Sequence, residues 1–100
     1  MKTFDFTFNY DLAVGIIRSF RIDFINANEV GLTFQVEDSE YEIPYGGYIK
    51  MKDVPRLRKI LGAKASEDII GKEVAFTYIP ETGFIAAIGN PKTNHMVKCI

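Results

Sequence analysis

The sequence has few of the residues and segments that mark secreted, membrane-spanning or metal-binding proteins. Its 100 residues include one cysteine, Cys99, and one histidine, His95. A single thiol cannot form a disulfide within the chain, so nothing indicates an oxidising compartment. No apolar run approaches the roughly 20 residues of a membrane span, and the first residues alternate phenylalanine with polar residues, unlike a signal peptide. We therefore expect a cytoplasmic protein without a membrane segment.

The sequence also lacks the motifs of nucleotide-binding and catalytic sites. It contains neither a G-x-x-x-x-G-K-[ST] loop nor a G-x-G-x-x-G turn. A zinc site needs about four ligands, or three and a water, and the chain has no second histidine or cysteine to add to His95 and Cys99. Four residues apart on a terminal strand, these side chains lie too far apart for a catalytic pair, and Cys99 is predicted to be an ordinary thiol near a frayed end. We expect no enzyme, no bound metal and no cofactor.

The composition is that of one globular domain. Hydrophobic residues make up 47% of the chain and charged residues 25%, and a chain of this length can bury one core. Aromatic residues are frequent at 13%, as eight phenylalanines and five tyrosines, and their flat rings favour the pleated surface of β-strands. We expect a single domain over residues 1–100.

The first quarter of the chain alternates between apolar and polar residues. Apolar side chains occupy the even positions from Phe4 to Phe24 except at Arg18, which is typical of strands with one buried face. One strand is rarely this long. The pattern therefore predicts two strands, at about residues 3–9 and 14–25, with even-numbered side chains inward and a break near residues 11–15.

A helix over residues 11–20 is the alternative for the second of these strands. Asp11 would cap it, and apolar residues four positions apart would share one face. Gly15 and the β-branched residues beside it favour the strand.

Further strands and one helix are predicted after residue 28. The predicted elements are strands at residues 30–36, 41–45, 74–78 and 84–88, a helix at 53–61, a short helical turn at 66–70 and a closing strand within 95–100. Pro44 lacks an N–H and indicates a sheet edge, and Gly46-Gly47 indicates a turn or bulge. Asp53 can cap the helix, and Gly62 suits the position just after its last turn.

Without the strand at residues 3–9, the predicted order is β-β-β-α-β-β. This is the order of the OB-fold, a five-stranded barrel with a helix between its third and fourth strands. We therefore expect a mainly β protein, a β-rich α+β fold built as a small antiparallel barrel or a strongly curved sheet. An SH3-like barrel, or an open sheet with one packed helix, has much the same pattern. The extra N-terminal strand either closes the barrel or pairs with another chain.

Charge is unevenly distributed, although the formal net charge is −1. Residues 23–42 carry six carboxylates and no lysine or arginine, whereas residues 50–64 carry six basic residues against Asp53. The carboxylates of residues 37–42 alternate with apolar residues, which is typical of a solvated face and not of an acid–base pair. The basic segment follows tyrosines and glycines, and rings combined with cations are enriched at binding surfaces. The predicted binding residues are Tyr45, Tyr48, Lys50, Lys52, Arg56, Arg58 and Lys59.

Two functions fit this predicted surface. In the first, which we favour, the protein is a small non-enzymatic module that acts by contacting another protein, steered by its opposed charge patches. Accessory and inhibitor proteins of mobile elements have this character. In the second, the same residues bind single-stranded nucleic acid by stacking and phosphate contacts, although a net charge of −1 weakens such binding. A homo-oligomer, or a packing role for the tyrosines with the cations merely solvating the helix, are the remaining alternatives.

Overall fold

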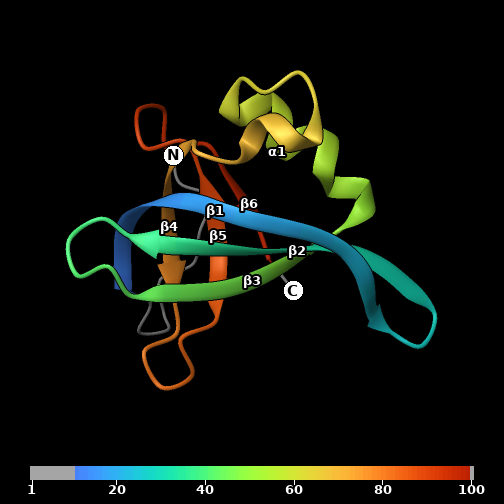
Figure 1. Ribbon diagram of the computed structural model, residues 1–100, viewed down its shortest axis with the longest axis horizontal. Coiled ribbons are helices and arrows are strands. Elements are labelled where there is room, and N and C mark those ends of the chain that lie inside the picture. Colours follow the sequence, from blue (N-terminus) through green and yellow to red (C-terminus); the bar gives the residue numbers. More distant parts are fainter. Residues whose placement is uncertain (1–10, 100) are drawn as a thin grey trace.

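The computed structural model describes residues 11–99, and strands dominate this part of the chain (Figure 1). The elements are β1 (Asp11–Asn26), β2 (Glu29–Asp38), β3 (Pro44–Lys50), η1 (Met51–Asp53), α1 (Val54–Leu61), η2 (Ser66–Ile69), β4 (Glu73–Tyr78), β5 (Ile85–Gly89) and β6 (Met96–Lys98), where η marks a 3₁₀ helix. The strands form one antiparallel sheet in the order β3-β2-β1-β4-β5-β6. The mainly β class and the order β-β-β-α-β-β are confirmed, and β6 is the predicted closing strand.

The expected barrel is wrong, because the six-stranded sheet is neither closed nor strongly curled. The pairing of β5 explains why. It pairs with β4 on one side and with β6 on the other, so it has no free edge along which β3 could pair. The pairing of β3 in this region is limited to one parallel β-bridge, between Gly46 and Phe84, the residue before β5. The extra strand predicted at residues 3–9 lies outside the described residues.

β1 is one strand of 16 residues, which confirms the strand interpretation of residues 11–20 and overturns the predicted break. A bulge takes the place of the break, because the register with β2 shifts between Ile17 and Ser19. A shift of one residue exchanges the two faces of a strand. Ile17 is therefore fully buried, whereas Leu12 is 71% exposed on the opposite face. The predicted inward direction of even-numbered side chains holds only after the bulge, where β1 pairs with Leu32 and Phe34 of β2.

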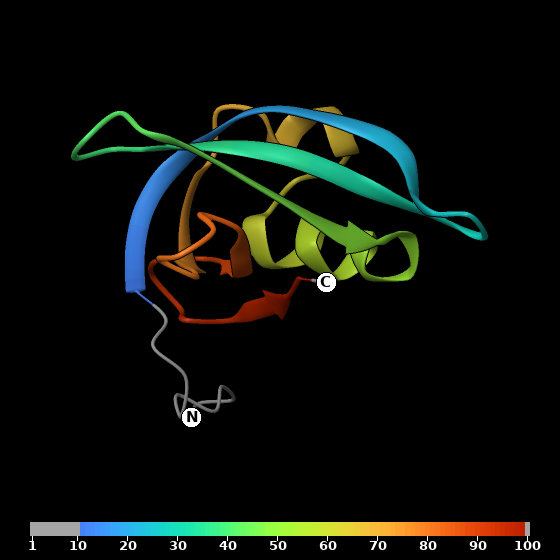
Figure 2. The ribbon, with the colours of Figure 1, turned by 90° about the horizontal axis from the view of Figure 1, so that it is seen from below.

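The hydrophobic core contains side chains from all six strands, from α1 and from η2, and α1 contacts the sheet chiefly at β5 and β6 (Figure 2). The largest fully buried side chains are Ile17, Leu32, Val36 and Ile49 from β1–β3, Leu57 from α1, Ile69 from η2, and Val74, Phe76, Thr77, Ile85, Ile88 and Val97 from β4–β6. α1 begins after Asp53 as predicted, although the Asp53 side chain makes no capping hydrogen bond. It ends at Gly62, whose φ of +71° is in the left-handed region that glycine adopts most readily. This arrangement leaves Arg56 and Lys59 on the solvent side of α1.

β3 begins later than predicted, at Pro44, and it forms an edge of the sheet as predicted. The chain before it turns at Asp38, whose carboxylate accepts from the N–H groups of Glu40 (2.7 Å) and Tyr41 (2.9 Å). Gly46-Gly47 lies inside β3, so the predicted turn or bulge there is wrong. Packing explains Gly47, because a Cβ at this position would lie 2.9 Å from the Cβ of Ile85 and 3.1 Å from the Phe34 ring. The glycine lets β3 and β5 approach closely.

Candidate functional site

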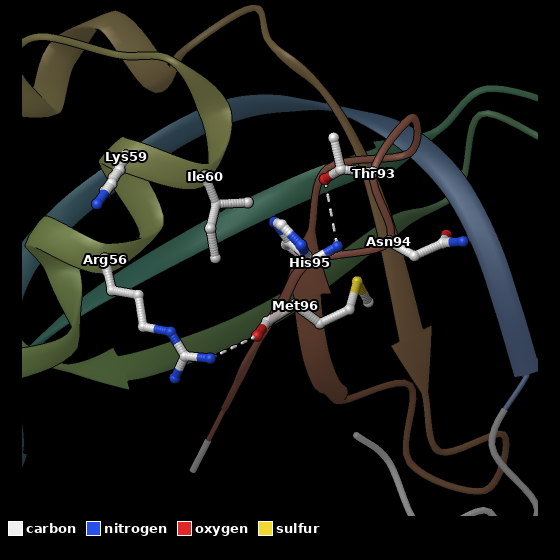
Figure 3. Close-up of a pocket in the computed structure, with 7 residues that line it drawn as sticks. All are labelled: Arg56, Lys59, Ile60, Thr93, Asn94, His95 and Met96. Carbon is white, nitrogen blue, oxygen red and sulfur yellow. Dashed lines mark hydrogen bonds between the residues drawn. The ribbon is translucent and has the colours of Figure 1, made fainter. Parts of the chain in front are cut away.

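A groove with a volume of about 1020 Å³ lies between α1 and the chain leading into β6. It is lined by Arg56, Lys59 and Ile60 of α1 and by Thr93, Asn94, His95 and Met96 on the opposite wall (Figure 3). We call these seven residues the basic groove. Arg56 spans it, since its Nη2 donates a long hydrogen bond of 3.4 Å to the Met96 carbonyl.

One asparagine positions the loop wall of the basic groove. The Nδ2 of Asn90 donates to the Ile60 carbonyl on α1 (2.9 Å), and its Oδ1 accepts from the Lys92 N–H (2.8 Å). The Asn90 main chain exchanges two further bonds across the loop, donating to the His95 carbonyl and accepting from the Asn94 N–H, both at 3.0 Å. The loop is thus closed on itself and attached to α1 by the Asn90 side chain, so its polar groups are held at a fixed position beside the helix.

The basic groove has an uncompensated positive charge. None of its seven residues is acidic, and no salt bridge among the described residues involves Arg56 or Lys59. The two segments that supply its lining residues, residues 50–64 and 90–98, together hold eight lysines and arginines against one aspartate, and of these cations Lys50 pairs with Glu29 away from the groove. The formal charge of the two segments is +7, so the rest of the chain carries −8 within the total of −1. Charge segregated in this way creates a strong local potential despite the near-neutral total.

Two of the predicted binding residues, Arg56 and Lys59, line the basic groove, and Arg58 does not. Lys52 in η1, Arg56 and Lys59 are exposed. Arg58 instead fastens the segment after α1, because its Nη1 donates to the Lys64 carbonyl at 2.9 Å. Its Nε is buried and has no hydrogen-bond partner within the described part of the chain. We therefore assign Arg58 to the structure of the helix end and not to a contact surface.

The two predicted tyrosines point to opposite faces of β3. Tyr45 packs against the core, with its ring centroid 4.5 Å from that of Tyr78 and 5.4 Å from that of Phe76. Tyr48 is on the outer face and lines a second, shallower hollow of about 540 Å³ together with Phe84. Residues three positions apart on a strand necessarily lie on different faces. The predicted surface is therefore not contiguous.

The cations beside Tyr48 are each paired with a carboxylate, unlike those of the basic groove. The pairs on this outer face are Arg18 with Glu37 at 2.7 Å, Arg21 with Asp23 at 3.2 Å and Lys50 with Glu29 at 3.9 Å. These pairs are exposed, so each contributes little to stability. They do cancel the local charge, and the aromatic and cationic parts of the predicted surface are consequently separated.

Residues 93–96 are functional candidates that the sequence did not reveal. The only signal is that residues 90–98 contain Lys92 and Lys98 and no carboxylate. That run is too short to predict a site by itself. Its meaning depends on the contact between Asn90 and Ile60, which are thirty residues apart in the sequence.

Cys99 and His95 are in different environments. His95 is exposed in the basic groove, whereas Cys99 is 7% exposed and belongs to the core. The Cys99 N–H donates to the Ala86 carbonyl at 2.8 Å, so the predicted frayed end is wrong. The cause is that β6 packs its inward residues against the core. Burial raises the pKa of the Cys99 thiol from 9.0 to about 12.

We expect the Cys99 thiol of the folded protein to resist thiol reagents at pH 8. The reactive species is the thiolate, and a pKa of about 12 in place of 9.0 lowers its fraction by about a thousandfold, one factor of ten for each unit. Reaction with a chromogenic disulfide reagent, followed at 412 nm, should be slow in buffer and rapid in urea. Equal rates in the two conditions would contradict the buried position of Cys99.

Comparisons of the chain with protein-family models, with curated proteins and with solved structures find no match. The described residues include no helix of the length and apolar character needed to cross a membrane. They also include no group of three or more histidine, cysteine, aspartate or glutamate side chains arranged to hold a metal ion. The site must therefore be interpreted from its own geometry and charge.

Proposed function

We propose that the protein is a non-enzymatic binding module that docks on an acidic surface of another protein through its basic groove. The observation that supports this most directly is that Arg56 and Lys59 of α1 line a groove whose opposite wall, residues 93–96, contains no carboxylate. Unpaired cations around a concave surface attract a complementary acidic patch and steer its approach.

The division of charge over the whole chain supports the same function. A formal charge of +7 on residues 50–64 and 90–98 faces −8 elsewhere, so the molecule has one attractive side toward an acidic partner and one repulsive side. Such a dipole orients the encounter, which is the main contribution of charge to protein association. Exposed His95 adds a further polar side chain within the groove, and exposed Lys52 adds a cation in η1, just before α1.

Single-stranded nucleic acid fits the described surface less well. Stacking needs exposed rings close to unpaired cations, and none of the described residues of the basic groove is a phenylalanine or tyrosine. The half-buried ring of Tyr48 and the exposed ring of Phe84 lie in the other hollow, where Arg21 is already close to Asp23. A nucleic-acid strand that contacted both the basic groove and the hollow at Tyr48 would also pass carboxylates, which repel its phosphates.

A titration with two anionic probes of equal length tests the proposal. We expect a glutamate decapeptide to shift the amide NMR signals of α1 and residues 93–96, with an affinity that falls as salt shortens the screening length from about 10 Å at 0.1 M to about 3 Å at 1 M. The double variant Arg56→Ala, Lys59→Ala should bind the decapeptide about tenfold more weakly, since it loses two charge contacts. A thymidine decamer is the competing probe.

The control variant is Arg18→Ala, Lys72→Ala, which removes two cations outside the basic groove and changes the net charge equally. It should bind the glutamate decapeptide as the unchanged protein does. Stronger binding of the thymidine decamer, with shifts at Tyr48 and Phe84, would replace the proposal with the nucleic-acid function. Absence of any shift with either probe would remove the basic groove as a binding site.

A further inference from the structure

The second half of β1 has an open edge. Pairing of β1 with β4 ends at Ile16, and Ile17 makes the last main-chain bonds on that side, with Lys72 (3.1 Å) and Gly71 (2.7 Å). From Arg18 to Asn26 the described strands pair with β1 only through β2. The β1–β2 hairpin also projects past the helices (Figures 1 and 2). An edge of this length presents a row of main-chain donors and acceptors for another strand.

The main-chain groups that face this edge belong to three apolar residues. The Arg21 carbonyl accepts from the Thr33 hydroxyl of β2 at 3.2 Å, so it points toward β2. Directions alternate along a strand, and Phe20, Ile22 and Phe24 therefore point their N–H and C=O groups to the open side. Consistent with this, the Phe24 N–H donates to the neighbouring Asp23 carboxylate at 2.8 Å and not to β2.

The side chains along this edge form a self-complementary sequence. Residues 20–24 read Phe-Arg-Ile-Asp-Phe. If a second copy is laid antiparallel with a two-fold axis at Ile22, each Phe20 faces a Phe24 and each Arg21 faces an Asp23. Charges and rings would then match on both sides of the axis, and opposite charges and aromatic pairs are the cross-strand pairs that stabilise antiparallel sheets.

The face that such a dimer would cover is exposed and apolar. Ile22 is 53% exposed, Phe24 is 69% exposed and Val30, which pairs with Phe24 on the same face, is 37% exposed. These residues are on the core side of the sheet but at the hairpin end, beyond the buried cluster. The Arg21 and Asp23 side chains are on the opposite face and are 74% and 44% exposed, so both remain accessible.

From these observations we propose that a second copy of this chain pairs with β1, edge to edge and antiparallel, about a two-fold axis at Ile22. The result is one continuous sheet across the dimer, with the two Arg21–Asp23 pairs on one face and the Ile22 and phenylalanine side chains in contact on the other. A closed two-fold contact uses the same edge of both copies, which removes it from further pairing. The basic groove takes no part in this contact.

Exchanging the two charges tests the pairing. Arg21→Asp places carboxylates opposite each other, and Asp23→Arg places cations opposite each other, so each single variant should weaken the dimer by about tenfold or more in sedimentation velocity. The double variant Arg21→Asp, Asp23→Arg restores opposite charges and should restore dimerisation. All three changes are on an exposed face, so circular dichroism should show an unchanged fold.

Amide exchange gives a second measurement that needs no variant. The amides of Phe20, Ile22 and Phe24 should become protected as the protein concentration rises, whereas that of Asp23, on the β2 side, should not change. A monomer at millimolar concentration overturns the proposal. So does a dimer that Arg56→Ala, Lys59→Ala abolishes and Arg21→Asp leaves intact, because that dimer would use the basic groove. The proposed binding of an acidic partner is tested separately, by the decapeptide titration, so either proposal can fail without the other.

Discussion

Replacing Gly89 with alanine is expected to lower the free energy of unfolding by about 3 kcal/mol or more, because the added methyl group would overlap atoms of β6 and the residue before it. Gly89 ends β5 and pairs with Met96 of β6. A Cβ at this position would overlap the His95 carbonyl and would lie 2.6 Å from the Met96 sulfur and 2.7 Å from the Met96 Cα. Two of these three atoms are main chain, so a side-chain rotation cannot relieve the overlap.

The consequence would reach the basic groove directly. The His95 carbonyl that the methyl group displaces also accepts from the Asn90 N–H, and Asn90 attaches the loop to α1. Gly89→Ala should therefore weaken binding of the glutamate decapeptide as well as stability. Urea unfolding followed by circular dichroism measures the first effect, and the NMR titration measures the second.

Gly46→Ala is the matched control for this prediction. Gly46 is also a strand glycine, but a Cβ there meets only the Phe34 carbonyl, at 4.0 Å. This change should alter stability by no more than about 0.5 kcal/mol. If Gly89→Ala were tolerated equally well, the close approach of β5 and β6, and with it the loop wall of the groove, would be wrong.

Elements whose signals are local could be predicted from the sequence. The β4–β5 hairpin has alternation on both sides of a turn that contains Gly83, and α1 has its start and end signals in Asp53 and Gly62. Gly83 and Gly62 do adopt positive φ, at +73° and +71°. In these segments the residues that decide the structure lie within a few positions of it, so one sequence is enough.

The face pattern of β1 could not be predicted, because it depends on a bulge. The register shift between Ile17 and Ser19 involves no glycine or proline that would have marked it. One extra residue exchanges the inward and outward sets, so an alternation that only Arg18 interrupts in the sequence became two half-patterns in the structure. The exposed Leu12 and Phe24 follow from that exchange and from the length of the hairpin.

Gly46-Gly47 and the basic groove were missed for a related reason. Two successive glycines favour a turn locally, but Gly47 is needed for the approach of Ile85 and Phe34, which are distant in sequence. The groove likewise needs α1 and residues 93–96 side by side, a contact made through Asn90. Tertiary neighbours decide both features, and a single sequence does not show which segments become neighbours.

Phe76→Ala is expected to cost about 3 to 5 kcal/mol of unfolding free energy, which is the range for a phenylalanine removed from a packed core. Phe76 is fully buried in β4, which lies between β1 and β5. Its ring is 5.4 Å from that of Tyr45 and 5.9 Å from that of Tyr78, centroid to centroid. Because a small domain has only about 5 to 15 kcal/mol in total, the variant should unfold at a much lower urea concentration.

Phe84→Ala is the matched truncation, since Phe84 is 59% exposed and its change should cost less than about 1 kcal/mol. Equal losses of unfolding free energy for the two variants would contradict the buried position of the Phe76 side chain. The same ring cluster decides how Tyr45 must be treated in binding studies. Tyr45 packs on Phe76 and Tyr78, so Tyr45→Ala would reduce binding by loosening β3 even if Tyr45 touches no partner. Lys52 is exposed in η1, just before α1, so its removal tests whether the predicted surface contacts a partner without disturbing the core.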